Sequence, residues 1–152
     1  MDMSQCMKRN VVSIEAQATI AEAAALIVKH HIGLLPVVNS DGRLIGVLGL
    51  RDLLSLSMPV FVKLLDDLDF VYDFGAVEDA LPDPIALAKP VTSLMRAAIS
   101  VKASSGLLRA YSLLEHHHIH DLPVVDDAGR LVGIASRVDI GAAILGRWQP
   151  EE

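Results

Sequence analysis

The spacing of apolar residues predicts a strand, a helix, two strands and a second helix in the first third of the chain. The β-branched stretch 11–14 predicts a short strand, and residues 18–31 carry apolar side chains at the intervals of one helix face. Two further apolar runs, 34–39 and 43–50, flank the turn sequence SDG and predict a β-hairpin, and a second helix is expected from residue 51. The residues expected on the buried face of the first helix are Ile20, Ala23, Ala24, Ile27 and Val28.

Two local signals mark where these elements begin and turn. Thr19 followed by Glu22 forms a capping-box pattern, in which each side chain satisfies a free backbone amide at the start of a helix. Asp41-Gly42 is expected to supply the positive-φ residues that a tight hairpin requires. The first helix should therefore start just after Thr19, and the chain should reverse at Gly42.

The same order of elements occurs a second time. HHIGLLPVV at residues 30–38 returns as HHIHDLPVV at residues 117–125, and Pro36/Pro123 and Asp52/Asp139 are each separated by 87 positions. Each copy of about 50 residues lies near the lower limit for an independent core, so the copies are expected to fold against each other. We predict an α+β fold with a first repeat at residues 1–56, an insertion at residues 57–93 and a second repeat at residues 94–152.

The insertion at residues 57–93 differs in composition from both repeats. It is acidic and holds four of the six aromatic residues of the chain, Phe61, Phe70, Tyr72 and Phe74. A bare linker is poor in aromatic residues, so we expect a partly helical segment. Its aromatic side chains would pack on the two repeats or across a dimer; the alternative is a surface that docks a partner or gates a ligand.

Composition narrows the classes of function. The chain is 52% apolar with a mean hydropathy of +0.43, which predicts a globular protein, and its aromatic content of 4% predicts an aliphatic core. A net charge of −6 argues against nucleic-acid binding, which depends on Lys and Arg neutralising phosphates. A single cysteine, with no bilayer-length apolar run and no secretory signal, predicts a cytoplasmic protein without membrane insertion.

The repeated phrases resemble a tandem pair of CBS domains, also called a Bateman module. The resemblance rests on HHIGLLPVVNSDGRLIGVLGLRD and HHIHDLPVVDDAGRLVGIASRVD, on the lead-ins CMKRNVVSI and LMRAAISV, and on the helix in each copy, and it covers about residues 3–56 and 91–146. It implies two β-α-β-β-α repeats packed about a pseudo-two-fold axis, two clefts, a homodimer, and an adenosine ligand: AMP, ADP or ATP, or alternatively S-adenosylmethionine or NAD. No cofactor is required.

The ligand motif of that family is complete in the second repeat as Gly133, Ser136 and Asp139. A carboxylate can accept hydrogen bonds from both ribose hydroxyls, and a hydroxyl at a helix start can seat phosphate oxygens. Without the resemblance, Ser136 and Asp139 are an ordinary helix-capping signature, and the capping and ligand-binding roles can coexist. The resemblance implies a main cleft completed by the first repeat, lined by Val12, Ile32, Gly33, Leu34, Ser136 and Asp139.

The first repeat departs from the motif, because Gly49 stands where the hydroxyl belongs, although Asp52 is kept. An acidic residue at position 121 would repel phosphate there. We therefore predict one competent site and a second cleft that is weak, empty or differently used. The residues assigned to the second cleft are Gly49, Asp52, Ile99, Ile119, His120 and Asp121.

The histidines and arginines admit several roles. Histidines at the end of each first helix favour a capping or surface role, because helix C-termini stabilise cationic side chains. The resemblance implies that His31 and His118 can reach nucleotide phosphates, and Arg137 is a further phosphate candidate, as are Arg51, Arg43 and Arg130. A metal site in the His-rich corner is the third possibility. Met7 and Met95 are interpreted as core residues.

These observations favour a stand-alone regulatory module that senses an adenosine compound and modulates an unidentified partner. Neither a Walker loop nor an H-E-x-x-H motif occurs, and Cys6 and Ser136 lack the setting of a nucleophile, so an enzyme is not predicted. One alternative is a dimerisation or interaction scaffold without a ligand. The other is a divalent-metal sensor that uses His118 and His120.

Overall fold

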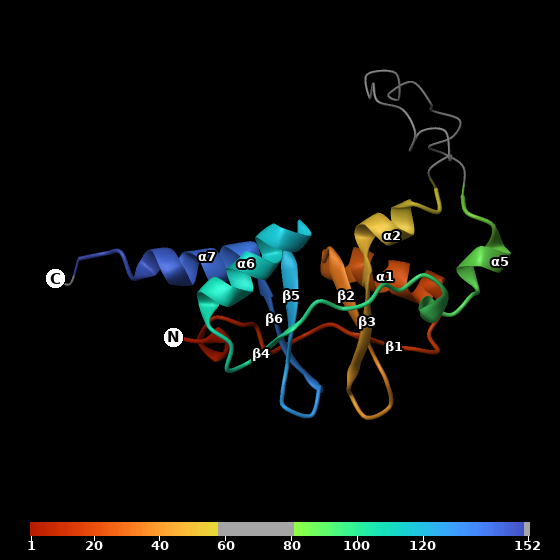
Figure 1. Cartoon of the computed structure of the whole chain (residues 1–152). Helices are drawn as coiled ribbons and strands as arrows, with labels where there is room; N and C mark the ends of the chain where they lie inside the picture. The colour runs from red at the N-terminus through yellow and green to blue at the C-terminus, as the bar shows by residue number, and fades with distance from the viewer. Residues whose placement is uncertain (58–80, 151–152) are drawn as a thin grey trace, which may run out of the picture.

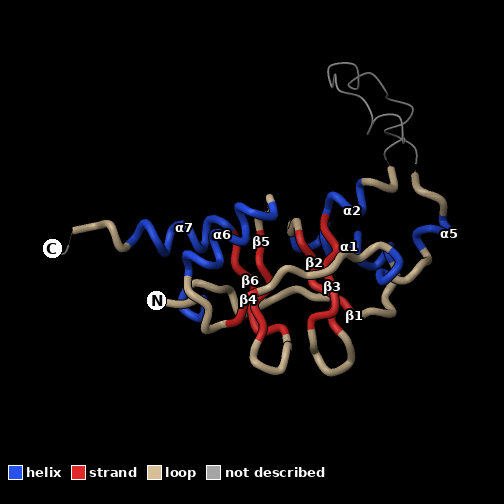
Figure 2. Tube along the Cα trace, in the orientation of Figure 1, coloured by secondary structure: helices blue, strands red, loops and turns tan. Residues whose placement is uncertain are grey.

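The structure is a computed structural model that describes residues 1–57 and 81–150. It consists of two halves, each built on a three-stranded sheet (Figures 1 and 2). In each sheet the first strand runs parallel to the second, and the second and third form an antiparallel hairpin. The strands are β1 (Ile14–Glu15), β2 (Leu34–Val38), β3 (Leu44–Gly49), β4 (Val101–Lys102), β5 (Asp121–Val125) and β6 (Leu131–Ser136).

Helices lie beside each sheet on the side away from the other half. Figure 1 shows α1 and α2 with the first sheet, and α6 and α7 with the second. The helices are α1 (Ile20–His30), α2 (Leu50–Leu54), α5 (Pro84–Leu87), α6 (Leu107–His117) and α7 (Arg137–Gly146), with 3-10 turns η1 (Met3–Gln5) and η3 (Val91–Ser93). The predicted α+β fold with two β-α-β-β-α repeats is confirmed. Among the described residues, none of these helices is long and apolar enough to cross a bilayer.

The capping box predicted for α1 is present. The Thr19 hydroxyl oxygen accepts a hydrogen bond from the Glu22 backbone N–H at 3.2 Å, and the Glu22 carboxylate accepts one from the Thr19 N–H at 3.0 Å. The helix buries Ile20, Ala23 and Ile27, as its spacing predicted. Val28 was expected on this face but is 77% exposed. The part of the α1 surface that packs on the core is narrower than the set of apolar residues along the helix.

Each hairpin turns through a loop in which one glycine has a positive φ, 79° at Gly42 and 81° at Gly129. The prediction that Asp41 shares this conformation was wrong. In the first hairpin, the loop is instead closed by the Asn39 carboxamide oxygen, which accepts hydrogen bonds from the N–H groups of Asp41 and Arg43 at 3.0 Å each. A single left-handed glycine after such a turn is the usual solution for a three-residue loop.

The lead-in segments cross between the halves. Lys8 exchanges backbone hydrogen bonds with Ile134 of the second sheet at 2.8 and 2.9 Å, and Arg96 exchanges them with Val47 of the first sheet at 2.9 and 2.8 Å. The strand predicted at 11–14 is therefore wrong for residues 11–13, which bridge the two sheets, and only Ile14 belongs to β1. The two repeats are joined through exchanged segments.

Each half has its own aliphatic core. Each core also contains a residue that precedes the other repeat in the sequence, Val91 in the first core and Met3 in the second. Val91 is fully buried in the first core, together with Leu35, Val37 and Leu48. Met3 is fully buried in the second core, which also contains Met7. Val91 and η3 lie inside the predicted insertion 57–93, as does α5. Residues 58–80, with Phe61, Phe70, Tyr72 and Phe74, lie outside the described residues, so the expected packing of these aromatics stays a prediction.

The hairpins meet in a reciprocal contact that confirms the pseudo-two-fold arrangement. The Leu44 N–H donates to the Gly129 carbonyl at 3.0 Å, and the Leu131 N–H donates to the Gly42 carbonyl at 3.0 Å. The donors are separated by 87 positions in the sequence, and so are the acceptors. The same pair of contacts viewed from either half is what a local dyad produces.

Candidate ligand-binding cavities

Two cavities lie where the repeats meet, and each is bordered by the lead-in segment of one repeat. The first, which we call the Asp139 cavity, has a volume of about 270 Å³. It brings together all six residues predicted for the main cleft: Val12, Ile32, Gly33, Leu34, Ser136 and Asp139. The first four come from one repeat and the last two from the other, so a molecule in this cavity would contact both. Their role as ligand contacts stays a prediction.

The Asp139 carboxylate both caps α7 and borders the cavity. Its Oδ2 accepts a hydrogen bond from the Ser136 N–H at 2.9 Å, and the Ser136 hydroxyl accepts one from the Asp139 N–H at 3.0 Å. Lys8 Nζ lies 3.7 Å from the same oxygen. Within the described part of the chain, Oδ1 takes part in no hydrogen bond. The capping and binding roles predicted from the sequence are therefore compatible, because Asp139 Oδ2 caps the helix and Oδ1 is available for a ligand.

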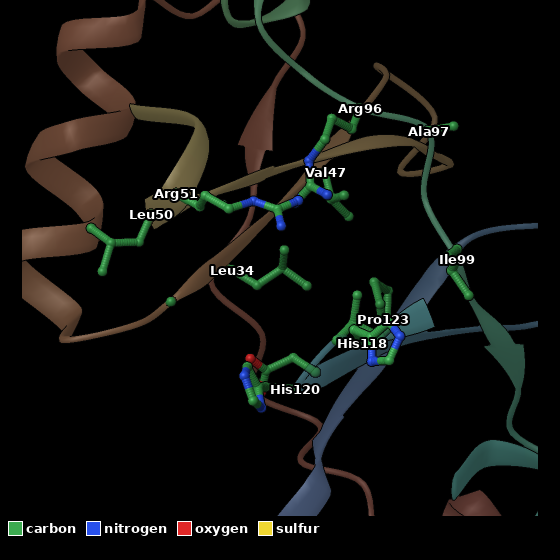
Figure 3. Close-up of a pocket in the computed structure, with 14 residues that line it drawn as sticks. Leu34, Val47, Leu50, Arg51, Arg96, Ala97, Ile99, His118, His120 and Pro123 are labelled. Atoms are coloured by element: carbon green, nitrogen blue, oxygen red, sulfur yellow. The ribbon is translucent and has the colours of Figure 1, made fainter. Parts of the chain in front are cut away.

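The second cavity, which we call the Asp52 cavity, is larger, at about 480 Å³. Five of the six residues predicted for the second cleft line it: Gly49, Ile99, Ile119, His120 and Asp121. Figure 3 shows Arg51, at the start of α2, and Arg96, on the second lead-in, both extending into this cavity, with His118 and His120 across from them. The predicted second cleft thus exists and carries more positive charge than the sequence suggested.

Asp52 itself is not among the residues that line that cavity, and its role as a ligand contact stays a prediction. Its Oδ2 accepts hydrogen bonds from the Gly49 N–H at 2.7 Å and from Arg96 Nε at 3.0 Å, and its Oδ1 lies 2.9 Å from Arg96 Nε. Both carboxylate oxygens are thereby engaged, and the side chain is only 11% exposed. Because Arg96 pairs with the carboxylate, Asp52 differs from Asp139 despite its matching position.

Leu34 and Asp121 occupy matching positions at the start of β2 and β5, and each borders both cavities. Burial, and to a smaller extent the nearby Asp139 carboxylate, raises the pKa of Asp121 above its ordinary value, against the opposing charges of His120 and Lys8. Asp139 and Lys8 both line the Asp139 cavity, so Asp121 acts electrostatically there. Its unfavourable effect on phosphate is therefore not confined to the second cleft, where we had expected it.

The phosphate candidates are divided between the cavities. His31 lines the Asp139 cavity and His118 lines the Asp52 cavity. Both end their helices in the left-handed conformation at φ 52°, a conformation usually taken by Gly or Asn, and they satisfy the last helical carbonyls through their backbone N–H groups. Arg137 reaches neither cavity, because its Nη2 pairs with Glu115 at 3.3 Å. Arg43 and Arg130 lie in the two hairpins, where their backbones form an antiparallel β-bridge with each other.

Sequence reasoning missed Lys8 and Arg96, the two basic residues nearest the paired carboxylates. The sequence did carry a signal, because Lys8 directly follows Met7 and Arg96 directly follows Met95. In the structure each of these methionines packs on a glycine of the opposite sheet. Met7 meets Gly133 and Met95 meets Gly46 so closely that an added methyl group would lie within 2.7 Å of a sulfur atom. The methionines are buried or partly buried core residues, as interpreted.

The His-rich corner does not assemble a metal site in the described part of the chain. Among residues 1–57 and 81–150, no three His, Cys, Asp or Glu side chains converge to hold one ion. His116 and His117 stack edge to face at 4.8 Å between ring centroids, on the outside of α6.

Comparison with known proteins finds the CBS domain. The family model of the CBS domain matches residues 3–59 and 91–146. A CBS domain-containing protein from Dictyostelium discoideum is 28% identical over 148 residues, which are 97% of this chain and 94% of that protein. A homoserine O-acetyltransferase from Methanocorpusculum labreanum is 30% identical over 134 residues, but this chain spans only 22% of its length.

Solved structures share the fold over nearly the whole chain. CBSX2, solved in complex with AMP, superposes with a TM-score of 0.72 at 26% identity and covers 97% of this chain and 98% of its own. A CBS domain protein from Pyrobaculum aerophilum, also complexed with AMP, superposes with a TM-score of 0.72 at 26% identity and covers 97% of both chains.

Proposed function

The chain belongs to the CBS domain family, and from that premise we propose that it is a regulatory module that binds an adenosine compound between its two repeats. The observation that carries the proposal is the Asp139 carboxylate, which borders a cavity shared by both repeats and keeps one oxygen outside its helix cap. A carboxylate so placed can accept hydrogen bonds from both hydroxyls of a ribose. CBSX2 and the Pyrobaculum aerophilum protein, both complexed with AMP, support this ligand class.

The remaining lining residues fit an adenosine. Val12 and Ile32 offer apolar surface to a purine, and the backbone at Gly33 and Leu34 supplies polar groups that can read its edge. The Ser136 hydroxyl and His31 are the candidates for a more polar substituent on the ribose. AMP, ADP, ATP, S-adenosylmethionine and NAD remain the candidate ligands. The Asp52 cavity, whose carboxylate is already paired, would be used differently.

Regulation would follow from the position of the cavity. A ligand shifts a conformational equilibrium only through unequal affinity for the two states. A molecule held by Val12 and Gly33 on one side and by Asp139 on the other would be sensitive to the relative position of the repeats. A partner, a homodimer and a cytoplasmic location are part of this proposal, as is any activity attached to a longer protein of the kind that the homoserine O-acetyltransferase represents.

A thermal-shift panel tests the proposal directly. We expect at least one of adenosine, AMP, ADP, ATP, S-adenosylmethionine and NAD to raise the melting temperature, because a ligand that binds only the folded state stabilises it. Guanosine compounds at the same concentration serve as controls. Absence of a shift with every adenosine compound would overturn the proposal and favour the scaffold alternative.

A substitution then locates the site. Asp139→Asn keeps the size of the side chain and its capping acceptor but removes the charge, so calorimetry should show adenosine binding at least about tenfold weaker, about 1.4 kcal/mol. Glu22→Gln is the matched control, because Glu22 occupies the same capping position in α1 and lines neither cavity. Equal affinity in Asp139→Asn and the wild-type protein would remove Asp139 from the site.

A further inference from the structure

The matching positions 34 and 121 carry side chains of different character, a leucine and an aspartate. The repeats superpose these residues at the start of β2 and β5, where each borders both cavities. Figure 3 shows the apolar side chain of Leu34 near the centre of the Asp52 cavity. The charged neighbours of the Asp121 carboxylate are His120, which lines the Asp52 cavity, and Asp139 and Lys8, which line the Asp139 cavity. One position therefore presents a hydrocarbon and its counterpart an acid.

The Asp139 cavity is poorly suited to an anion. It contains two carboxylates, Asp121 and Asp139, and its cation Lys8 is 68% exposed and directed to Asp139 at 3.7 Å. An exposed lysine is screened by solvent, whereas partly buried carboxylates are screened less. A phosphate group placed beside Asp121 would meet like charge in a confined space.

The Asp52 cavity has the opposite character. Arg51 and Arg96 both line it, and Asp121 is the one carboxylate among its lining residues, since the Asp52 carboxylate that pairs with Arg96 is not one of them. A planar guanidinium group presents five N–H donors and matches the geometry of phosphate oxygens. Arg96 bonds Asp52 through Nε, which leaves its outer nitrogens for another acceptor. Leu34 adds no charge that would oppose an anion.

We propose that the two cavities sort ligands by charge, so that the Asp52 cavity takes a phosphorylated adenosine compound through Arg51 and Arg96, which outweigh Asp121, while Asp121 and Asp139 together restrict the Asp139 cavity to adenosine compounds without a phosphate. This rests on the proposed function, since it assigns ligand classes to cavities that are first required to bind adenosine compounds. The module would then report two different metabolites, one anionic and one not, at sites that share the backbone of residues 33–34.

The experiment is a pair of calorimetric titrations with adenosine and AMP. For the wild-type protein we expect one AMP per chain. In Asp121→Asn, which keeps the shape of the side chain, a second AMP should bind, with affinity in the Asp139 cavity raised at least about tenfold, while adenosine affinity changes less than about twofold. Asp127→Asn is the control, because it removes the same charge from an exposed hairpin position.

The reciprocal substitution completes the test. Arg51→Gln should weaken the wild-type AMP site about tenfold and leave adenosine binding within about twofold. Unchanged AMP binding in both variants, or equal changes for AMP and adenosine, would overturn the sorting while leaving the proposed function intact. Failure of the wild-type protein to bind either compound would instead overturn the proposed function.

Discussion

The Asp139 and Asp52 cavities are built by the same backbone register and yet have opposite electrostatic character. In the first, a carboxylate keeps one oxygen available and is flanked by a second acid, Asp121. Beside the second, the matching carboxylate is engaged by the Gly49 N–H and by Arg96, and Arg51 and Arg96 face Asp121 as the one lining carboxylate. The comparison teaches that a repeated fold fixes where a cavity forms, whereas a few side chains at matching positions decide what it can hold.

The largest effects on stability should occur where the lead-in segments cross the two sheets, an arrangement that the two halves share. Gly46 and Gly133 let the opposite lead-in strand pass, and an added methyl group would lie 2.9 Å from the Arg96 carbonyl oxygen or 3.1 Å from that of Lys8. Because backbone atoms must move, Gly46→Ala and Gly133→Ala should each lower the free energy of unfolding by about 1–3 kcal/mol, as measured in urea. A loss below about 0.5 kcal/mol in either variant would contradict the close crossing of the lead-ins.

An intermediate effect should separate the two ion pairs. Arg96→Met leaves the nearly buried Asp52 carboxylate without its cation, so the free energy of unfolding should fall by about 2 kcal/mol. Lys8→Met removes an exposed partner 3.7 Å away, and the loss should stay below about 0.5 kcal/mol. Urea denaturation of both variants measures the difference, and equal losses would show that the two carboxylates are held alike.

The smallest effect concerns the pH dependence of Asp121. Burial raises the pKa of this carboxyl group in the folded protein, although His120 and Lys8 oppose the shift and Asp139 adds to it. The neutral form is favoured by folding, so its contribution to stability is complete below the ordinary pKa of 3.8 and is lost as the pH rises through the folded-state pKa. At neutral pH, Asp121→Asn should therefore be more stable than the wild-type protein by on the order of 0.5 kcal/mol.

Unfolding curves of both proteins between pH 3 and pH 7, about one per pH unit, would measure how the stability difference between Asp121→Asn and the wild-type protein depends on pH. The advantage of Asp121→Asn should shrink toward zero as the pH falls. An advantage that is constant with pH would mean that the carboxylate is solvated and does not influence the Asp139 cavity.

Local elements were predictable from the sequence because their signals are local. Thr19 and Glu22 fixed the start of α1, and the glycine at position 42 fixed the reversal of the first hairpin. The 87-residue register indicated two equivalent repeats, and the resemblance to a pair of CBS domains implied their pseudo-two-fold packing and the residues that line the Asp139 cavity.

What the sequence did not reveal depends on contacts between distant residues. No residue near Asp52 in the sequence indicates that Arg96, 44 positions away, pairs with its carboxylate. The exchange of Met3 and Val91 between the cores is equally invisible to local patterns. The left-handed conformation of His31 was missed because helix ends of that kind usually carry glycine.

The most direct test of separate, charge-selective cavities is a competition between adenosine and AMP in the wild-type protein. Calorimetric titration of AMP should be run with and without saturating adenosine. Since the two compounds are assigned to different cavities, AMP affinity and stoichiometry should stay within about twofold of their values without adenosine. Loss of the AMP binding heat in the presence of adenosine would show that both compounds compete for one cavity and would contradict the account.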